Sequence, residues 1–341
     1  MSSRRNNGWS RRKFLSTAAL AGAGSLLKLP SDLSAAEPPP ETTRIRILMG
    51  RGVCTTAPNY VAEEFLRQEG FTNVQYIQGS GGLDDEKVLA SGAADFMGAF
   101  AGRHLYGVDA GAPMVVLAGL HVGCYELFGT ERILSIRDLK GKRVAVTQLT
   151  SGRHILFSIM AANVGLDPRK DIIWVTESVD TSIQMLAEKK VEAYMAFPLE
   201  PQRLKAQKTG HVLVDTTTDR PWSQYFCCMV AANREFVRRY PVATKRALRS
   251  LLKATDICAR EPERAAKSLI DKGYTDHHDF AVDAVKGIEY GKWRDYDPED
   301  TMRYYALRMY EVGMIKNNPQ KILAQGTDWR FVRELKKELK T

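Results

Sequence analysis

Cysteine and histidine, the residues that most often carry chemistry, are few and scattered in this chain. The cysteines are Cys54, Cys124, Cys227, Cys228 and Cys258. None forms the C-x-x-C pair with companion histidines that a zinc site usually shows. Cys227 and Cys228 are adjacent in a strand-like run, so their side chains should point to opposite faces. We therefore expect buried core thiols and no metal site, with at least one cysteine unpaired because the count is odd.

The histidines and carboxylates show no catalytic pattern either. None of the six histidines has the spacing of a catalytic triad or of a metal motif. Glu177 and Glu200 could form an acid–base pair, but nothing in the sequence sets their separation. Without a convergent nucleophile, metal or cofactor signature, the sequence predicts a binding protein that is not an enzyme and uses no cofactor.

Loops that follow predicted strands are better candidates for a ligand site. Residues 142–165 predict a strand, a polar loop and a helix whose Leu156, Ile159 and Met160 share one face. Free N–H groups at such a helix start favour a polar or anionic group. A second loop of this kind spans 50–55, before a helix expected to start near Pro58. The third, 79–82, is glycine-rich but lacks the spacing of a nucleotide-binding loop.

Two parts of the chain share one order of elements. A constant shift lays Arg46 to Met49 on Arg143 to Val146, and the same shift lays Asp95 on Glu192. Each part predicts strand, loop, helix, strand, loop, helix, strand. This alternation is typical of an α/β fold in which helices cover both faces of a parallel sheet.

The predicted site lies at the carboxyl ends of the strands, where open α/β sheets bind ligands. Helix starts and Arg153 favour an anion, whereas Glu177 and the aromatic residues suit a heteroaromatic amine. The balance leans to an anionic, sulfonate-like organic solute. The candidate residues are Gly52, Val53, Cys54, Thr55, Ser80, Gly81 and Phe100 in the first part, and Thr150, Ser151, Gly152, Arg153, Glu177 and Phe197 in the second.

The N-terminal segment predicts export. Residues 10–15 (SRRKFL) resemble the twin-arginine motif, and a small-residue site at 34–36 follows an apolar run. That run is shorter than the ~20 residues needed to span a bilayer. We expect residues 1–36 to be a signal cleaved near Ala36, residues 37–43 to be a proline-rich leader, and the protein to be periplasmic. Much of the net charge of +9 lies in this signal, so the remainder lacks the strong positive charge expected of a nucleic-acid-binding protein.

The rest of the chain predicts two lobes, with lobe two inserted into lobe one. Residues 44–127 and 224–341 should form lobe one, and 128–223 lobe two with the hinge segments. Residues 113–124 and 224–232 read as strands of lobe one, and the segment from Arg234 onward is helical. Pro262, Pro298 and Pro319 mark later helix starts.

This plan resembles the type 2 periplasmic solute-binding proteins of ABC importers. The motifs that carry the resemblance are SGAADF at 91–96, DLKGKRVAV at 138–146 and NREFVRRYPVATKRAL at 233–248. Within that superfamily the chain is similar to the nitrate, sulfonate and taurine group, which includes binders of thiamine-pyrimidine precursors.

The resemblance implies a monomeric capture subunit whose partners are a small solute and the importer's permease and ATPase. An exported enzyme on the same fold, a ligand sensor, and a thiamine-pyrimidine precursor binder or synthase are the alternatives. The synthase branch carries three cysteines followed by Phe where this chain has residues 226–229 (FCCM). The missing third cysteine and Phe weaken the iron-dependent synthase interpretation.

Overall fold

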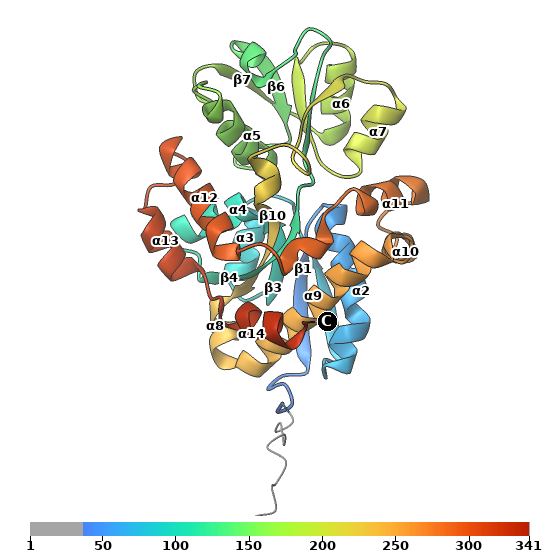
Figure 1. The fold of residues 1–341 in the computed structure, drawn as a ribbon, viewed down its shortest axis with the longest axis vertical. Coiled ribbons are helices and arrows are strands. Elements are labelled where there is room, and N and C mark those ends of the chain that lie inside the picture. The colour runs from blue at the N-terminus through green and yellow to red at the C-terminus, as the bar shows by residue number, and fades with distance from the viewer. Residues whose placement is uncertain (1–36, 341) are drawn as a thin grey trace, which may run out of the picture. The chain divides into compact units, whose positions relative to one another are not determined.

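A computed structural model describes residues 37–340 (Figure 1). The predicted export signal with its cleavage site near Ala36, and Thr341, lie outside the described residues. Within the described part of the chain, no helix has both the length and the apolar character needed to cross a bilayer. From Pro39 onward the chain builds two five-stranded sheets, and the part around each sheet is called a lobe below.

Lobe one is built on the sheet β2-β1-β3-β10-β4. Strand β1 is parallel to β2 and β3, whereas β10 is antiparallel to β3 and β4. Its strands and first helices are β1 (Arg44–Met49), α2 (Val53–Gln68), β2 (Asn73–Gln78), α3 (Asp84–Ala90), β3 (Phe96–Phe100), α4 (Ala101–Asp109), β4 (Met114–Val122) and β10 (Phe226–Asn233). Strands β3, β4 and β10 are buried throughout, although β4 lies at the edge of the sheet.

Lobe two is built on the sheet β7-β6-β8-β5-β9, and all of it lies in sequence between β4 and β10. Strand β6 is parallel to β7 and β8, whereas β5 is antiparallel to β8 and β9. Its elements are β5 (Glu126–Gly129), η1 (Ile136–Leu139), β6 (Lys142–Val146), α5 (Gly152–Asn163), β7 (Ile172–Thr176), α6 (Val179–Ala187), β8 (Ala193–Ala196), α7 (Glu200–Ala206), β9 (His211–Asp215) and η2 (Trp222–Gln224). The predicted fold, with lobe two inserted into lobe one, is therefore confirmed.

The shared order of elements has a counterpart in side-chain contacts. In lobe one the backbone N–H of Arg46 donates to Asp95 Oδ2 at 2.8 Å, and its guanidinium reaches the same carboxylate. In lobe two the N–H of Arg143 donates to Glu192 Oε2 at 2.9 Å, again with a guanidinium contact. Each arginine lies in the first parallel strand, and each acid directly precedes the third. Each lobe therefore has an equivalent ion pair that helps to set the register of its first and third parallel strands.

The C-terminal segment is helical, as predicted, and covers lobe one (Figure 1). Helix α9 packs against α2, and α12 and α13 pack against α4. The face of α9 that contains Leu248, Leu251 and Leu252 is buried, as its helical spacing predicts. The elements are α8 (Arg234–Arg239), α9 (Pro241–Arg260), α10 (Pro262–Asp271), α11 (His278–Lys286), η3 (Tyr290–Trp293), α12 (Pro298–Glu311), α13 (Pro319–Gly326) and α14 (Arg330–Glu338).

Helix α2 begins at Val53, earlier than the start near Pro58 expected from the sequence. Proline has no N–H group, so Pro58 cannot donate to the carbonyl of Cys54 one turn earlier. The Tyr290 hydroxyl supplies that hydrogen bond instead, donating to Cys54 O at 3.0 Å. The helix therefore continues through the proline, and its first turn is held against the C-terminal segment.

The chain crosses between the lobes twice, after β4 and before β10, and the two crossing segments are joined at Thr216. The N–H groups of Cys124 and Tyr125 donate to Thr216 Oγ1 at 3.1 and 3.0 Å. In return, the Thr216 hydroxyl donates to Tyr125 O at 2.8 Å. These buried hydrogen bonds make one joint out of the two segments.

Candidate ligand-binding cleft

A cavity of about 530 Å³ lies between the two lobes. Its wall in lobe one comes from the loops after β1 and β2 and from the end of β3. Its wall in lobe two comes from the loops after β6 and β7 and from the region after β8. The volume falls in the range of small-molecule sites.

Most of the residues predicted from the sequence line this cavity. They lie at the end of a strand, in the loop after it or in the first turn of the following helix, as the strand-end rule requires. The predicted residues in the wall are Gly52, Thr55, Ser80, Gly81, Phe100, Ser151, Gly152, Arg153, Glu177 and Phe197.

Val53, Cys54 and Thr150 lie away from the cavity wall. Val53 and Cys54 occupy the first turn of α2 on its core side and are fully buried. The backbone of Thr150 has a positive φ of 67°. Its N–H donates to His154 Nδ1 at 3.1 Å, inside lobe two.

Other lining residues were not among those predicted from the sequence. Several, such as Gly50, Arg51 and Gln148, lie within the predicted loops, whereas Tyr125 lies on a crossing segment outside any strand–helix unit. These residues are Gly50, Arg51, Gly98, Ala99, Arg103, Tyr125, Thr147, Gln148, Ser178, Val179, Asp180, Glu200 and Cys228.

Arg103, three residues beyond Phe100, organises the glycine-rich loop of lobe one. Its guanidinium donates to Gly81 O at 3.2 Å and to Glu86 Oε2 at 2.7 Å. Burial of Arg103 favours its neutral form, but the Glu86 carboxylate outweighs that effect and raises the arginine pKa. The strand-end rule applied to β3 and the first turn of α4 would have found this residue.

The N–H groups of the glycine-rich loop are already engaged. Ser80 N donates to Asp85 Oδ1 at 2.7 Å, and Gly81 N donates to Asp85 Oδ2 at 3.0 Å. Asp85 is 2% exposed, so this carboxylate holds the position that a bound anion would otherwise take. The loop shapes the cleft without offering these two donors to a ligand.

Arg153 in lobe two is likewise paired. Its Nη2 donates to Glu200 Oε1 at 2.6 Å, and its Nη1 donates to Met195 O at 2.8 Å. Glu200 Oε2 also accepts from Tyr194 Oη at 2.7 Å and from Phe197 N at 2.9 Å. Burial lowers the pKa of Arg153, but the Glu200 carboxylate outweighs this and holds it above its usual value. Glu200 therefore acts as the counter-ion of Arg153, an arrangement that suits an ion pair better than a general base.

Aromatic rings form a continuous part of the wall. Phe100 of β3 meets Tyr125 of the crossing segment edge-on, with ring centroids 5.9 Å apart. Tyr125 in turn lies 4.7 Å from the ring of Phe197, in a tilted arrangement. This wall joins lobe one, the crossing segment and lobe two, and offers apolar contact to a ligand.

The two lobes approach each other closely at two glycines of lobe one. A Cβ atom at Gly52 would lie 1.9 Å from Phe197 Cε1, and one at Gly82 would lie 2.2 Å from Gln148 Nε2. Real Cβ atoms do not come so close to other heavy atoms. The absence of a side chain at these positions therefore permits the present approach of the lobes.

The cysteines lie closer together than the sequence suggested. Cys227 Sγ is 3.1 Å from Cys124 Sγ, and Cys228 Sγ is 4.0 Å from Cys54 Sγ. The adjacent residues Cys227 and Cys228 thus contact different cysteines, and the pairing of β10 with β4 shifts register on both sides of Cys228. All five cysteines are buried and free, which agrees with the expected core thiols.

Comparisons with known proteins identify the fold class first. Three solved structures, all less than 20% identical in sequence, share this fold of two lobes, which is the type 2 periplasmic-binding fold. The periplasmic nitrate-binding protein NrtA of Synechocystis PCC 6803 has a TM-score of 0.75 and 16% identity, covering 89% of this chain and 90% of its own. The alkanesulfonate-binding protein SsuA of Xanthomonas axonopodis pv. citri, bound to MOPS, has a TM-score of 0.68 and 17% identity, with coverages of 86% and 100%.

The third structure is the periplasmic aliphatic sulphonate binding protein SsuA of Escherichia coli. Its TM-score is 0.66 at 16% identity, and the match covers 83% of this chain and 91% of that one. A family model described as NMT1/THI5 like matches residues 55–265, and the chain belongs to this family. No curated protein sequence matches the chain.

Proposed function

We propose that this protein is the exported solute-binding subunit of an ABC importer, capturing a small organic solute between its lobes. The observation that carries the proposal is the cavity of about 530 Å³ whose walls come from strand ends of both lobes. A ligand held there would contact both lobes at once and would favour their closed arrangement. The fold, shared with proteins named for nitrate and alkanesulfonate binding, supports this function.

The wall chemistry favours an organic solute with one acidic group. The buried arginines Arg103 and Arg153 are neutralised by carboxylates, so neither supplies an unbalanced charge. Arg51 lines the cavity and forms no ion pair within the described part of the chain. With the start of α5 at Gly152, it is the best remaining partner for a sulfonate or carboxylate. The aromatic wall would hold the organic part.

The test is a thermal-shift panel on the full-length protein, followed by calorimetry. MOPS, taurine, nitrate, a pyrimidine and a simple amine are the probes. A ligand at about 100 times its Kd should stabilise the protein by ~2.7 kcal/mol. Arg51→Ala should weaken binding of a sulfonate roughly 10- to 100-fold, whereas Arg260→Ala, at the last residue of helix α9, should not.

The same panel separates the alternatives. Turnover of a stabilising compound would favour an exported enzyme on the same fold and refute the binding-only proposal. Binding without uptake of the ligand by cells that also produce an ABC permease and ATPase encoded beside this protein would favour a sensor. A response to pyrimidines alone would favour the thiamine-pyrimidine branch and refute the acidic-solute preference.

A further inference from the structure

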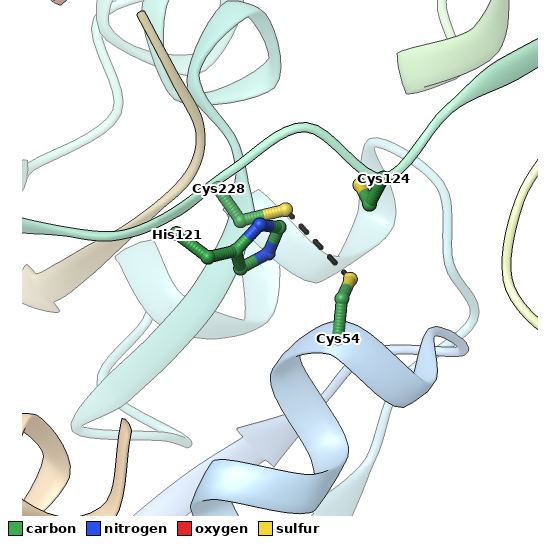
Figure 2. A group of neighbouring side chains, drawn as sticks. All are labelled: Cys54, His121, Cys124 and Cys228. Atoms are coloured by element: carbon green, nitrogen blue, oxygen red, sulfur yellow. Dashed lines mark hydrogen bonds between the residues drawn. The ribbon is translucent and has the colours of Figure 1, made fainter. Parts of the chain in front are cut away.

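Four buried side chains from four separate segments meet beside the cleft (Figure 2). Cys54 comes from the first turn of α2, His121 from β4, Cys124 from the crossing segment after β4, and Cys228 from β10. Each offers one donor atom, and these atoms all lie within 4.8 Å of one another. The side chains are at most 6% exposed. Only His121 and Cys124 are close in sequence, and Cys54 and Cys228 lie far from them along the chain, so spacing did not reveal the group.

We propose that Cys54, His121, Cys124 and Cys228 form a closed tetrahedral site for a zinc-like divalent metal ion. Three thiolates and one imidazole are an established donor set for structural zinc. Zn–S bonds of ~2.3 Å place the sulfurs of a tetrahedral site roughly 3.8 Å apart. The 4.0 Å between Cys54 Sγ and Cys228 Sγ is close to that spacing, so the donors need only small movements to surround an ion.

The histidine is oriented as a metal ligand would be. His121 Nδ1 lies 2.9 Å from Gly123 O, a contact that makes Nδ1 the protonated nitrogen. His121 Nε2 is buried and has no hydrogen-bond partner among the described residues. A backbone carbonyl that binds one ring nitrogen and leaves the lone pair of the other free is the usual support for a metal-bound histidine.

The backbone positions of two cysteine ligands are also supported. Tyr290 holds the carbonyl of Cys54, and Thr216 accepts a hydrogen bond from the N–H of Cys124. Cys227, 3.1 Å from Cys124, is a fourth sulfur next to the group but not part of it. That separation is well beyond the ~2.05 Å of a disulfide bond, so Cys124 remains available as a thiolate ligand.

Binding an ion would couple the site to the joint between the lobes. Cys124 lies in the crossing segment, whereas Cys54, His121 and Cys228 belong to lobe one. A bound ion would tie the first crossing segment to lobe one. With four protein ligands and no position left for water, the ion would have a structural role. Uptake of the ion would release the protons of the three thiols.

The test uses the full-length protein, reduced and stripped of metal under anaerobic conditions. Co²⁺ is the spectroscopic probe, and Zn²⁺ should displace it. We expect one equivalent of Co²⁺ to produce the intense visible bands of tetrahedral thiolate coordination, and native mass spectrometry to show one Zn²⁺ per chain. Cys54→Ser and His121→Ala should weaken Co²⁺ binding by more than about 100-fold.

Matched controls keep the outcome interpretable. Cys258 is buried in α9 outside the group, so Cys258→Ser should bind Co²⁺ like the parent, as should Cys227→Ser. Circular dichroism without metal checks that each variant is folded. A parent protein that stays metal-free by mass spectrometry would overturn the proposal without recourse to variants. Equal Co²⁺ spectra for the parent and a folded Cys54→Ser, or a Cys124–Cys227 disulfide in metal-free protein isolated from the periplasm, would also overturn it.

Discussion

Replacing Glu200 by glutamine should strongly destabilise lobe two. Glu200 accepts hydrogen bonds from Arg153, Tyr194 and the Phe197 N–H, and the side chains of the Arg153–Glu200 pair are only 10% and 13% exposed. Gln keeps the shape of the side chain but leaves the Arg153 charge buried without its counter-ion. Breaking a buried pair in this way costs ~3–5 kcal/mol.

Urea unfolding followed by circular dichroism measures this loss. At typical slopes of ~1–3 kcal/mol/M, the unfolding midpoint of Glu200→Gln should fall by more than about 1 M with little change in slope. The control is Asp180→Asn, which removes an exposed ion pair with Arg203 in the same lobe. Because the Asp180 side chain is 79% exposed, that change should cost less than about 1 kcal/mol.

A double variant tests the cause. Arg153→Met combined with Glu200→Leu removes both charges, and should recover most of the stability lost in Glu200→Gln. If Glu200→Gln alone costs less than about 1 kcal/mol, Glu200 does not neutralise Arg153 as described. The Arg153 charge would then be available to an anionic ligand, and the preference for Arg51 would be refuted.

Three further predictions concern the cleft, pH and export. Gly52→Ala should open the lobes, because its Cβ would lie 1.9 Å from Phe197; small-angle scattering should show a larger radius of gyration, restored by adding Phe197→Ala, and an unchanged curve would contradict the argument. Burial lowers the pKa of His104 to about 4, so the unfolded chain takes up a proton first and stability should fall as pH drops from ~6.5 to ~4. The urea unfolding midpoint should vary less with pH across this range in His104→Gln than in the parent. An equal pH dependence in the two proteins would argue against His104 as its cause. If residues 10–15 are the predicted twin-arginine motif, changing Arg11 and Arg12 to Lys should leave the precursor in the cytoplasm; undiminished periplasmic protein in cell fractions would show that another route suffices.

The sequence predicted the parts of the fold and site that repeat at regular spacing. The correspondence of Arg46 with Arg143 and of Asp95 with Glu192 already placed the parallel strands, and the strand-end rule placed residues such as Ser151 and Phe197 at the cleft. These inferences need only local patterns and one general property of α/β sheets.

The remaining features depend on contacts between distant segments. The pairing of Arg153 with Glu200 follows from how α5 packs beside β8, and spacing alone does not reveal it. The hydrogen bonds from the Ser80 and Gly81 N–H groups to the Asp85 carboxylate join residues close in sequence. They become evident only once the start of α3 is known. Cys54, His121, Cys124 and Cys228 come together only when α2, β4, β10 and the first crossing segment are all in place.

The joint at Thr216 restricts how the lobes can move. Because one hydroxyl binds both N–H groups of the opposite segment and the carbonyl of Tyr125, the two segments cannot slide past each other without breaking several buried hydrogen bonds. Rotation about the joint keeps those bonds. Displacement in a rotation grows with the length of the lever arm, so points far from Thr216 travel furthest. The aromatic contact between Tyr125 and Phe197, next to the pivot, would then be the last to separate when the lobes open.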